Sequence, residues 1–110
     1  EEARERVRAL AERFPTTGSV SLLRGRVLER SGLTREALEA FDAAVRQDPL
    51  LSAAYYHLGM AAARLGDFQR AHDSLATYTR LPDATPREAE RALRAAKLTA
   101  ELSGILEEER

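Results

Sequence analysis

The residues best suited to acid–base or metal chemistry in this chain are its two histidines, His57 and His72. Fifteen positions separate them, which is not the i, i+4 spacing of a helical metal-binding pair. The chain has no cysteine, which excludes disulfides, thiolate nucleophiles and cysteine-ligated zinc. Glu36 and Glu39 fall on a helix flank without an acid–base partner, and nucleotide-binding and serine-hydrolase motifs are absent. The sequence therefore predicts no enzyme active site, no metal site and no cofactor.

The length and charge of the chain limit the classes of protein to which it could belong. The chain has 110 residues, enough for one modest domain, and its 44% apolar and 32% charged residues suit a folded protein. The formal net charge is −1, so bulk charge favours neither nucleic acid nor a membrane surface. No apolar run approaches the roughly 18 residues of a membrane-spanning helix. The chain starts at Glu1 rather than Met, which leaves open a fragment or a removed signal peptide, with the cytoplasm slightly preferred.

An internal repeat of 34 residues organises the chain. Residues 18–49 and 52–83 align at this offset, and the match extends back into the first 15 residues. The positions that coincide include Gly25 with Gly59, Gly32 with Gly66, Ala37 with Ala71, and Phe41 with Leu75. A fixed period of this length is typical of a helix–turn–helix repeat.

The second copy carries Tyr55-x-x-Leu58-Gly59-x-x-Ala62, then Gly66, then Ala71-x-x-x-Leu75, then Pro82. This pattern resembles the tetratricopeptide repeat (TPR). The resemblance implies an all-α, right-handed α-solenoid of about six helices in a single domain. Its parts would be a half repeat over 1–15, full repeats over 18–49 and 52–83, and a capping helix over 85–110. The first full repeat departs from the pattern, because Ser21 replaces the aromatic residue and Arg24 replaces leucine.

Breaker and capping residues predict where the helices begin and end. We expect helix ends near Phe14, Ser31, Gln47, Leu65 and Leu81. Gly32 should end its helix in a left-handed conformation, and Gly25 should mark a close approach of the paired helix. The expected N-caps are Thr17 or Ser19, Asp48 and Asp67, with a capping box from Thr85 to Glu88.

Helical spacing of apolar residues predicts the core. We expect Phe41, Leu58, Ala71 and Leu75 to be buried. In the last helix the apolar stripe should run through Ala89, Ala92, Leu93, Ala96 and Ala100. Two stripes should lack a covering helix: Val7, Leu10 and Phe14 at one end, and Leu102, Ile105 and Leu106 at the other. Such stripes predict self-association through the terminal helices.

The resemblance also implies a binding surface, because the first helix of each TPR unit lines a concave face where partner segments lie. Carried over to this chain, that face contains the following candidate partner-binding residues: Arg26, Arg30, Tyr56, His57, Met60, Arg64, Arg91 and Arg94. Arginine forks there would pair with carboxylates around an aromatic and a methionine contact. The alternative is an ordinary solvated face, with the arginines paired to Glu29 and Glu90.

The function predicted from these features is a non-catalytic protein–protein interaction module. Its partner would be a protein or peptide that carries acidic groups. A self-assembling structural unit and a regulatory TPR segment of a larger protein or enzyme are the alternatives. The carboxylate clamp of chaperone-binding TPR proteins, built from two lysines, two asparagines and an arginine, is excluded. The chain contains no asparagine, and Lys97 is its one lysine.

Overall fold

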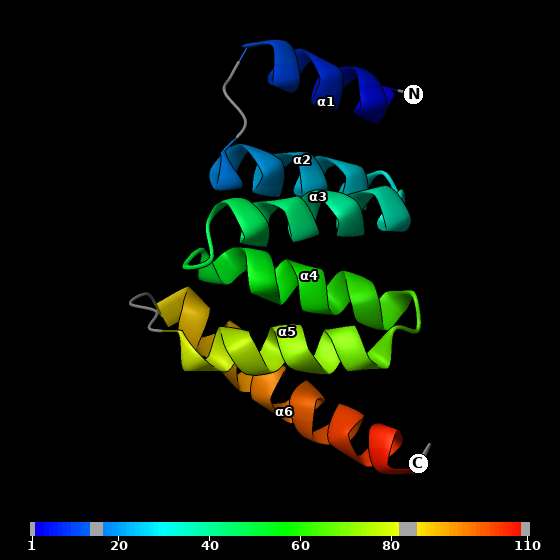
Figure 1. Cartoon of the computed structure of the whole chain (residues 1–110), viewed down its shortest axis with the longest axis vertical. Helices are drawn as coiled ribbons and strands as arrows, with labels where there is room; N and C mark the ends of the chain where they lie inside the picture. Colours follow the sequence, from blue (N-terminus) through cyan, green and yellow to red (C-terminus); the bar gives the residue numbers. More distant parts are fainter. Residues whose placement is uncertain (1, 14–16, 82–85, 109–110) are drawn as a thin grey trace.

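The chain folds into a stack of helices (Figure 1). The computed structural model describes residues 2–13, 17–81 and 86–108, and in these ranges every element is an α-helix and none is a strand. The six helices are α1 (Glu2–Arg13), α2 (Gly18–Arg30), α3 (Thr34–Gln47), α4 (Ser52–Arg64), α5 (Phe68–Arg80) and α6 (Pro86–Glu108). The predicted all-α fold is confirmed, and each predicted helix end lies within one residue of the observed one. Phe14 itself lies outside the described residues.

Helices that are consecutive in the sequence are neighbours in space. The pairs α2–α3 and α4–α5 lie side by side and antiparallel, α3 packs on α4, and α5 packs on α6 (Figure 1). The helix α1 lies against α2 at the other end of the stack. The molecule measures 44 × 31 × 21 Å, an elongated shape in which each unit contacts mainly its neighbours.

Two glycines set the separation within the helix pairs. A Cβ on Gly25 of α2 would overlap the ring of Phe41 of α3, and one on Gly59 of α4 would lie 2.6 Å from Leu75 Cγ of α5. Both positions therefore need glycine, although glycine inside a helix costs about 1 kcal/mol relative to alanine. The 34-residue repeat places the same contact in both pairs, and the predicted close approach at Gly25 is confirmed.

Local hydrogen bonds explain where the helices begin. Thr17 Oγ1 accepts from the Val20 N–H (3.3 Å), and Asp67 Oδ1 accepts from the Arg70 N–H (3.2 Å), as expected of N-caps. The cap predicted at Asp48 is wrong. Its carboxylate accepts from the Leu50 N–H at 3.2 Å and holds the turn, and α4 begins only at Ser52. The capping box at Thr85 falls outside the described residues.

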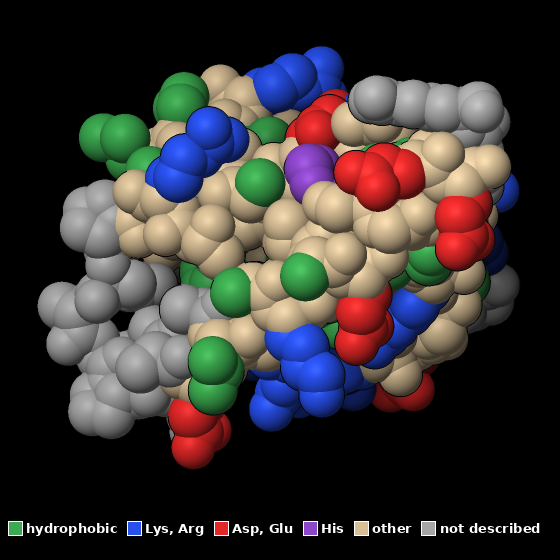
Figure 2. All heavy atoms as spheres, turned by 90° about the horizontal axis from the view of Figure 1, so that it is seen from below, with side chains coloured by type: hydrophobic (Ala, Val, Ile, Leu, Met, Phe, Trp, Pro, Cys, Tyr) green, Lys and Arg blue, Asp and Glu red, His purple; other side chains and the backbone are tan. Residues whose placement is uncertain are grey.

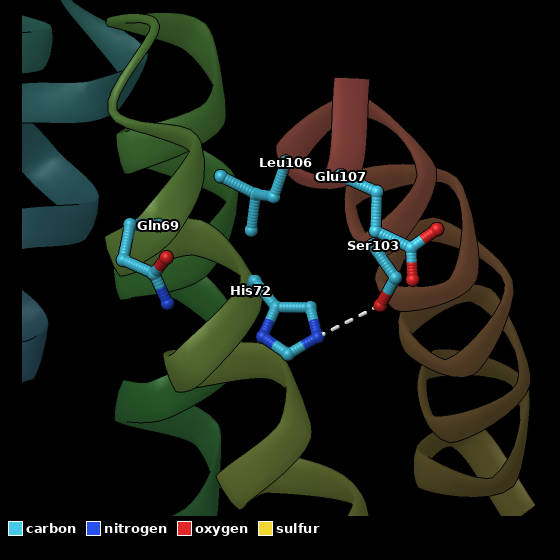
Figure 3. A pocket seen from close by; sticks show the side chains of 5 residues that line it. All are labelled: Gln69, His72, Ser103, Leu106 and Glu107. Carbon is cyan, nitrogen blue, oxygen red and sulfur yellow. Dashed lines mark hydrogen bonds between the residues drawn. The ribbon is translucent and has the colours of Figure 1, made fainter. Parts of the chain in front are cut away.

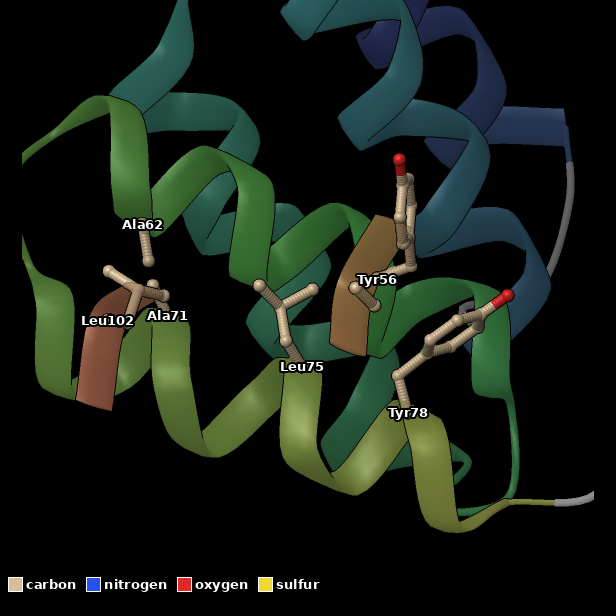
Figure 4. Packing of buried hydrophobic residues seen from close by; sticks show 7 residues of the cluster. Tyr56, Ala62, Ala71, Leu75, Tyr78 and Leu102 are labelled. Carbon is tan, nitrogen blue, oxygen red and sulfur yellow. The ribbon is translucent and has the colours of Figure 1, made fainter. Parts of the chain in front are cut away.

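The core consists of two apolar clusters that share α4. One joins α2, α3 and α4 around Leu28, Phe41 and Leu58. The other joins α4, α5 and α6 around Leu75, Tyr78 and Leu102 (Figure 4). All four residues predicted as core, Phe41, Leu58, Ala71 and Leu75, are buried.

The predicted apolar stripe of α6 is wrong. Leu93 is 75% exposed, and Ala96 and Ala100 are also exposed, whereas Ala95 and Leu102 are buried against α5. The 34-residue period places Leu93 and Ala96 where Gly59 and Ala62 of α4 meet α5. The helix α6 has no equivalent of α5 after it in the described residues, so it packs through its other face. The side chains of Ala89 and Ala92 lie outside the described part.

The terminal stripes are more covered than the sequence predicts. Leu102, expected to lack a cover, is 2% exposed and lies close to Ala62 and Ala71 (Figure 4). Val7 is half-buried against the α2–α3 cluster. Ile105 remains 37% exposed. The side chains of Leu10 and Phe14 lie outside the described residues.

Candidate functional site

The eight candidate residues come from α2, α4 and α6, the first helices of the repeat units. We call them the arginine face: Arg26, Arg30, Tyr56, His57, Met60, Arg64, Arg91 and Arg94. The face divides into a tyrosine cluster across α4 and α6, a histidine cluster across α2 and α4, and an arginine pair on α2. Met60 is half-buried beside the α4–α5–α6 core cluster.

Tyr56 is the centre of the tyrosine cluster. Its ring is 7% exposed and packs against Tyr78 with the ring centroids 5.3 Å apart. Arg94 Nη1 donates to the Tyr56 hydroxyl oxygen at 3.4 Å, and Arg91 lies over the ring, 5.7 Å from its centroid. The hydrogen bond raises the pKa of Arg94. Tyr56 is thus a core residue whose hydroxyl end orients Arg94, rather than an open contact surface.

His57 and Glu29 connect α4 to α2. The His57 ring stacks on Phe41, with the centroids 5.3 Å apart, and its Nδ1 lies 3.8 Å from Glu29 Oε1. The other Glu29 oxygen lies 3.5 Å from Arg64 Nη1. Burial lowers the pKa of His57 to about 4, with further contributions from Arg26, Arg91 and Arg64. Glu29 alone would raise that pKa, but burial and three guanidinium groups outweigh one carboxylate already shared with Arg64.

The arginine pair borders a shallow hollow on α2. Leu23, Arg26, Val27 and Arg30 line it, and its volume is about 170 Å³. Leu23 is 46% exposed. Neither Arg26 nor Arg30 forms an ion pair with another residue in the described part of the chain. The sequence identified both arginines, but it did not associate Val27 with them.

A second hollow, which the sequence did not predict, lies between α5 and α6. Gln69, His72, Ser103, Leu106 and Glu107 line about 160 Å³ (Figure 3). His72 Nε2 lies 3.0 Å from Ser103 Oγ, and His72 Nδ1 lies 3.4 Å from Asp73 Oδ1. A histidine in contact with a serine on one side and an aspartate on the other is the arrangement of the side chains in a hydrolase triad.

The backbone around Ser103 does not support nucleophilic catalysis. Ser103 lies inside α6, where the backbone N–H groups that would form an oxyanion hole bond within the helix. Asp73 follows His72 directly on α5 and also accepts from Gln69 Nε2 at 3.0 Å. The contact between His72 and Ser103 therefore joins α6 to α5. No group of three acidic or histidine side chains that could hold a metal occurs in the described residues.

Comparison with known proteins identifies the repeat. The family model described as tetratricopeptide repeat matches residues 1–50 and 22–86. The chain belongs to the tetratricopeptide repeat family. These TPR matches cover α1 to α5, including both glycine contacts. No curated protein matches the chain in sequence.

A solved structure has the same fold. The crystal structure of PcrH from Pseudomonas aeruginosa superposes with a TM-score of 0.78 and 20% sequence identity. The match covers 93% of this chain and 77% of that one. At this identity the likeness concerns the TPR fold, and it extends beyond the family-model match into α6. The described helices contain no segment with the length and apolar character that crossing a bilayer requires.

Proposed function

We propose that the chain is a non-catalytic interaction module that binds an acidic protein segment through the arginine face. A TPR fold supports a role in protein interaction. The partner and its site are our inference from the side chains. Five arginines lie on three helices, and the ion pair between Arg64 and Glu29 joins two of these helices. A segment with two or more carboxylates would neutralise Arg26 and Arg30, which form no ion pair with a described residue.

The observation that carries this proposal is the unpaired state of Arg26 and Arg30 beside an apolar hollow. Arg46, in contrast, pairs with Asp42 of the same helix at 3.3 Å. Arg26 and Arg30 have no such partner among the described residues. A ligand with carboxylates beside an apolar side chain would match both the charge and the hollow.

A displayed library of random 15-residue peptides, selected on the immobilised chain, tests this proposal. The selected sequences should be enriched in Asp and Glu next to Leu, Ile or Val. Replacing Arg26 and Arg30 together by Glu should remove the enrichment and leave the helical circular dichroism intact. The matched control replaces Arg35 and Arg80, which lie on the second helices, by Glu with the same change in net charge. Enrichment that survives the first variant, or that lacks acidic residues, would contradict the proposal.

A further inference from the structure

The hollow lies on one face of α2, and the equivalent face of α4 in the next repeat is buried. The 34-residue offset takes Leu23 to His57 and Val27 to Ala61. The His57 side chain is 13% exposed and Ala61 is fully buried, because the α2–α3 pair packs against that face of α4. In α2 the equivalent face leaves Leu23 46% exposed. The hollow thus combines an uncovered apolar floor with the guanidinium groups of Arg26 and Arg30, neither of which forms an ion pair with a described residue.

A complementary ridge lies on the C-terminal half of α6. Glu101, Ile105 and Glu108 follow each other at spacings of four and three, which places them on one face of the helix. Ile105 is 37% exposed, and both glutamates are exposed. Neither glutamate forms an ion pair with a described residue. The end of the stack that contains α6 displays acidic, basic and hydrophobic side chains in separate small groups (Figure 2).

The hollow and the ridge cannot meet within one molecule. The helix α2 lies toward the N-terminal end of the stack, and the last turns of α6 lie at the opposite end (Figure 1). The long axis of the molecule is 44 Å. Contact between these two surfaces therefore requires a second copy of the chain.

We propose that the chain associates head to tail, with the ridge of one copy seated in the hollow of the next. Ile105 enters between Leu23 and Val27, and Glu101 and Glu108 pair with Arg26 and Arg30. The hollow of about 170 Å³ is several times the roughly 30 Å³ that one water occupies, so it has room for a branched side chain. Opposite charges on both sides of an apolar contact set the register of the two helices.

The contact is heterologous, because each copy uses one surface as donor and a different one as acceptor. Each added copy leaves a free hollow at one end and a free ridge at the other. The assembly therefore grows beyond a dimer unless it closes into a ring. One apolar anchor and two exposed ion pairs form a small interface, so association is weak, depends on concentration and falls with salt. The contact between copies also covers Arg26 and Arg30. Self-association therefore competes with an acidic ligand for that part of the arginine face.

Sedimentation velocity on the purified chain, over a wide concentration range at low salt, tests the proposal. The average mass should rise above the 12.2 kDa of the monomer as concentration increases, and return toward it with added salt. A hollow variant carries Arg26→Glu and Arg30→Glu, and a ridge variant carries Glu101→Arg and Glu108→Arg. Each variant alone should stay monomeric, because its ridge and hollow then carry the same charge sign.

Mixing the two variants restores opposite charges at both contacts, so the average mass should rise again. The two control variants, Arg35→Glu with Arg80→Glu and Leu93→Asp, should associate like the original chain. A chain that stays monomeric at all concentrations would overturn the proposal. So would association that both reversed variants retain, or that mixing fails to restore. These outcomes are separate from the peptide selection, because sedimentation is measured without peptide and the ridge variant leaves the arginine face unchanged.

Discussion

Gly25 of α2 lies directly against the ring of Phe41 of α3, with no space for a single methyl group between them. Gly25→Ala should therefore destabilise the chain by about 1–3 kcal/mol, because overpacking a closed core outweighs the gain in helix propensity. Gly104→Ala is the control, since a Cβ on Gly104 of α6 meets nothing within 4 Å. That change should stabilise the chain by up to about 1 kcal/mol. Urea unfolding measures both, and a Gly25 variant as stable as the original would refute this packing.

The second helix of each full repeat has an alanine with no exposed surface, Ala37 in α3 and Ala71 in α5. Ala71→Glu should unfold the chain, because a buried carboxylate without a partner costs several kcal/mol against a total stability of about 5–15 kcal/mol. Ala100→Glu introduces the same charge at an exposed position of α6 and should leave the thermal midpoint nearly unchanged. Equal midpoints for the two variants would show that α5 does not pack as described.

Tyr56 contributes more to stability than its predicted place in a binding surface indicates. Tyr56→Ala should cost about 3–5 kcal/mol, the usual loss for truncating a buried aromatic residue. Tyr56→Phe keeps the ring against Tyr78 and removes only the acceptor for Arg94, so it should cost about 1 kcal/mol or less. Thermal unfolding of both variants measures the difference. If Tyr56→Ala were as stable as Tyr56→Phe, the ring would not be part of the core.

The repeat made the helix pairs predictable, because the same local pattern occurs twice. Gly25 with Phe41 and Gly59 with Leu75 are one contact repeated at an offset of 34 residues, so each copy supports the other. The side on which α6 packs was not predictable in this way. Its period-matched positions, such as Leu93, are those that would meet a following helix, and α6 instead buries Ala95 and Leu102 on α5.

Neighbouring tyrosines account for the main misplacement in the candidate site. Tyr55 occupies the aromatic position of the TPR pattern, but it is only half-buried and its hydroxyl donates to the Pro49 carbonyl at 2.9 Å. Tyr56 is buried instead, because Tyr78 and α6 cover it. The contact between His72 and Ser103 spans 31 residues and leaves no local signal in the sequence.

His57 should make the stability of the chain depend on pH. Its pKa is about 4 in the folded chain and about 6.5 when unfolded, so the unfolded state binds the proton more readily. Stability should therefore fall as pH decreases from about 6.5 toward 4, by up to about 3 kcal/mol, less any screening at the exposed edge of the ring. Urea unfolding at several pH values should show a smaller loss for His57→Gln than for His72→Gln. Identical pH profiles for these two variants would contradict the burial of His57.

The arginine face should act on an acidic ligand mainly through the association rate. Arg26, Arg30, Arg64 and Arg94 are exposed. Exposed charges are screened over about 8 Å at physiological ionic strength, so added salt should slow the association of a selected acidic peptide. Arg26→Ala with Arg30→Ala should reproduce that slowing at low salt. Leu23→Ala removes apolar floor without changing charge, so it should raise the dissociation rate instead. Surface plasmon resonance, with dilute peptide flowing over the immobilised chain, separates the two rates. Equal association rates at low and high salt would assign binding to another surface of the stack.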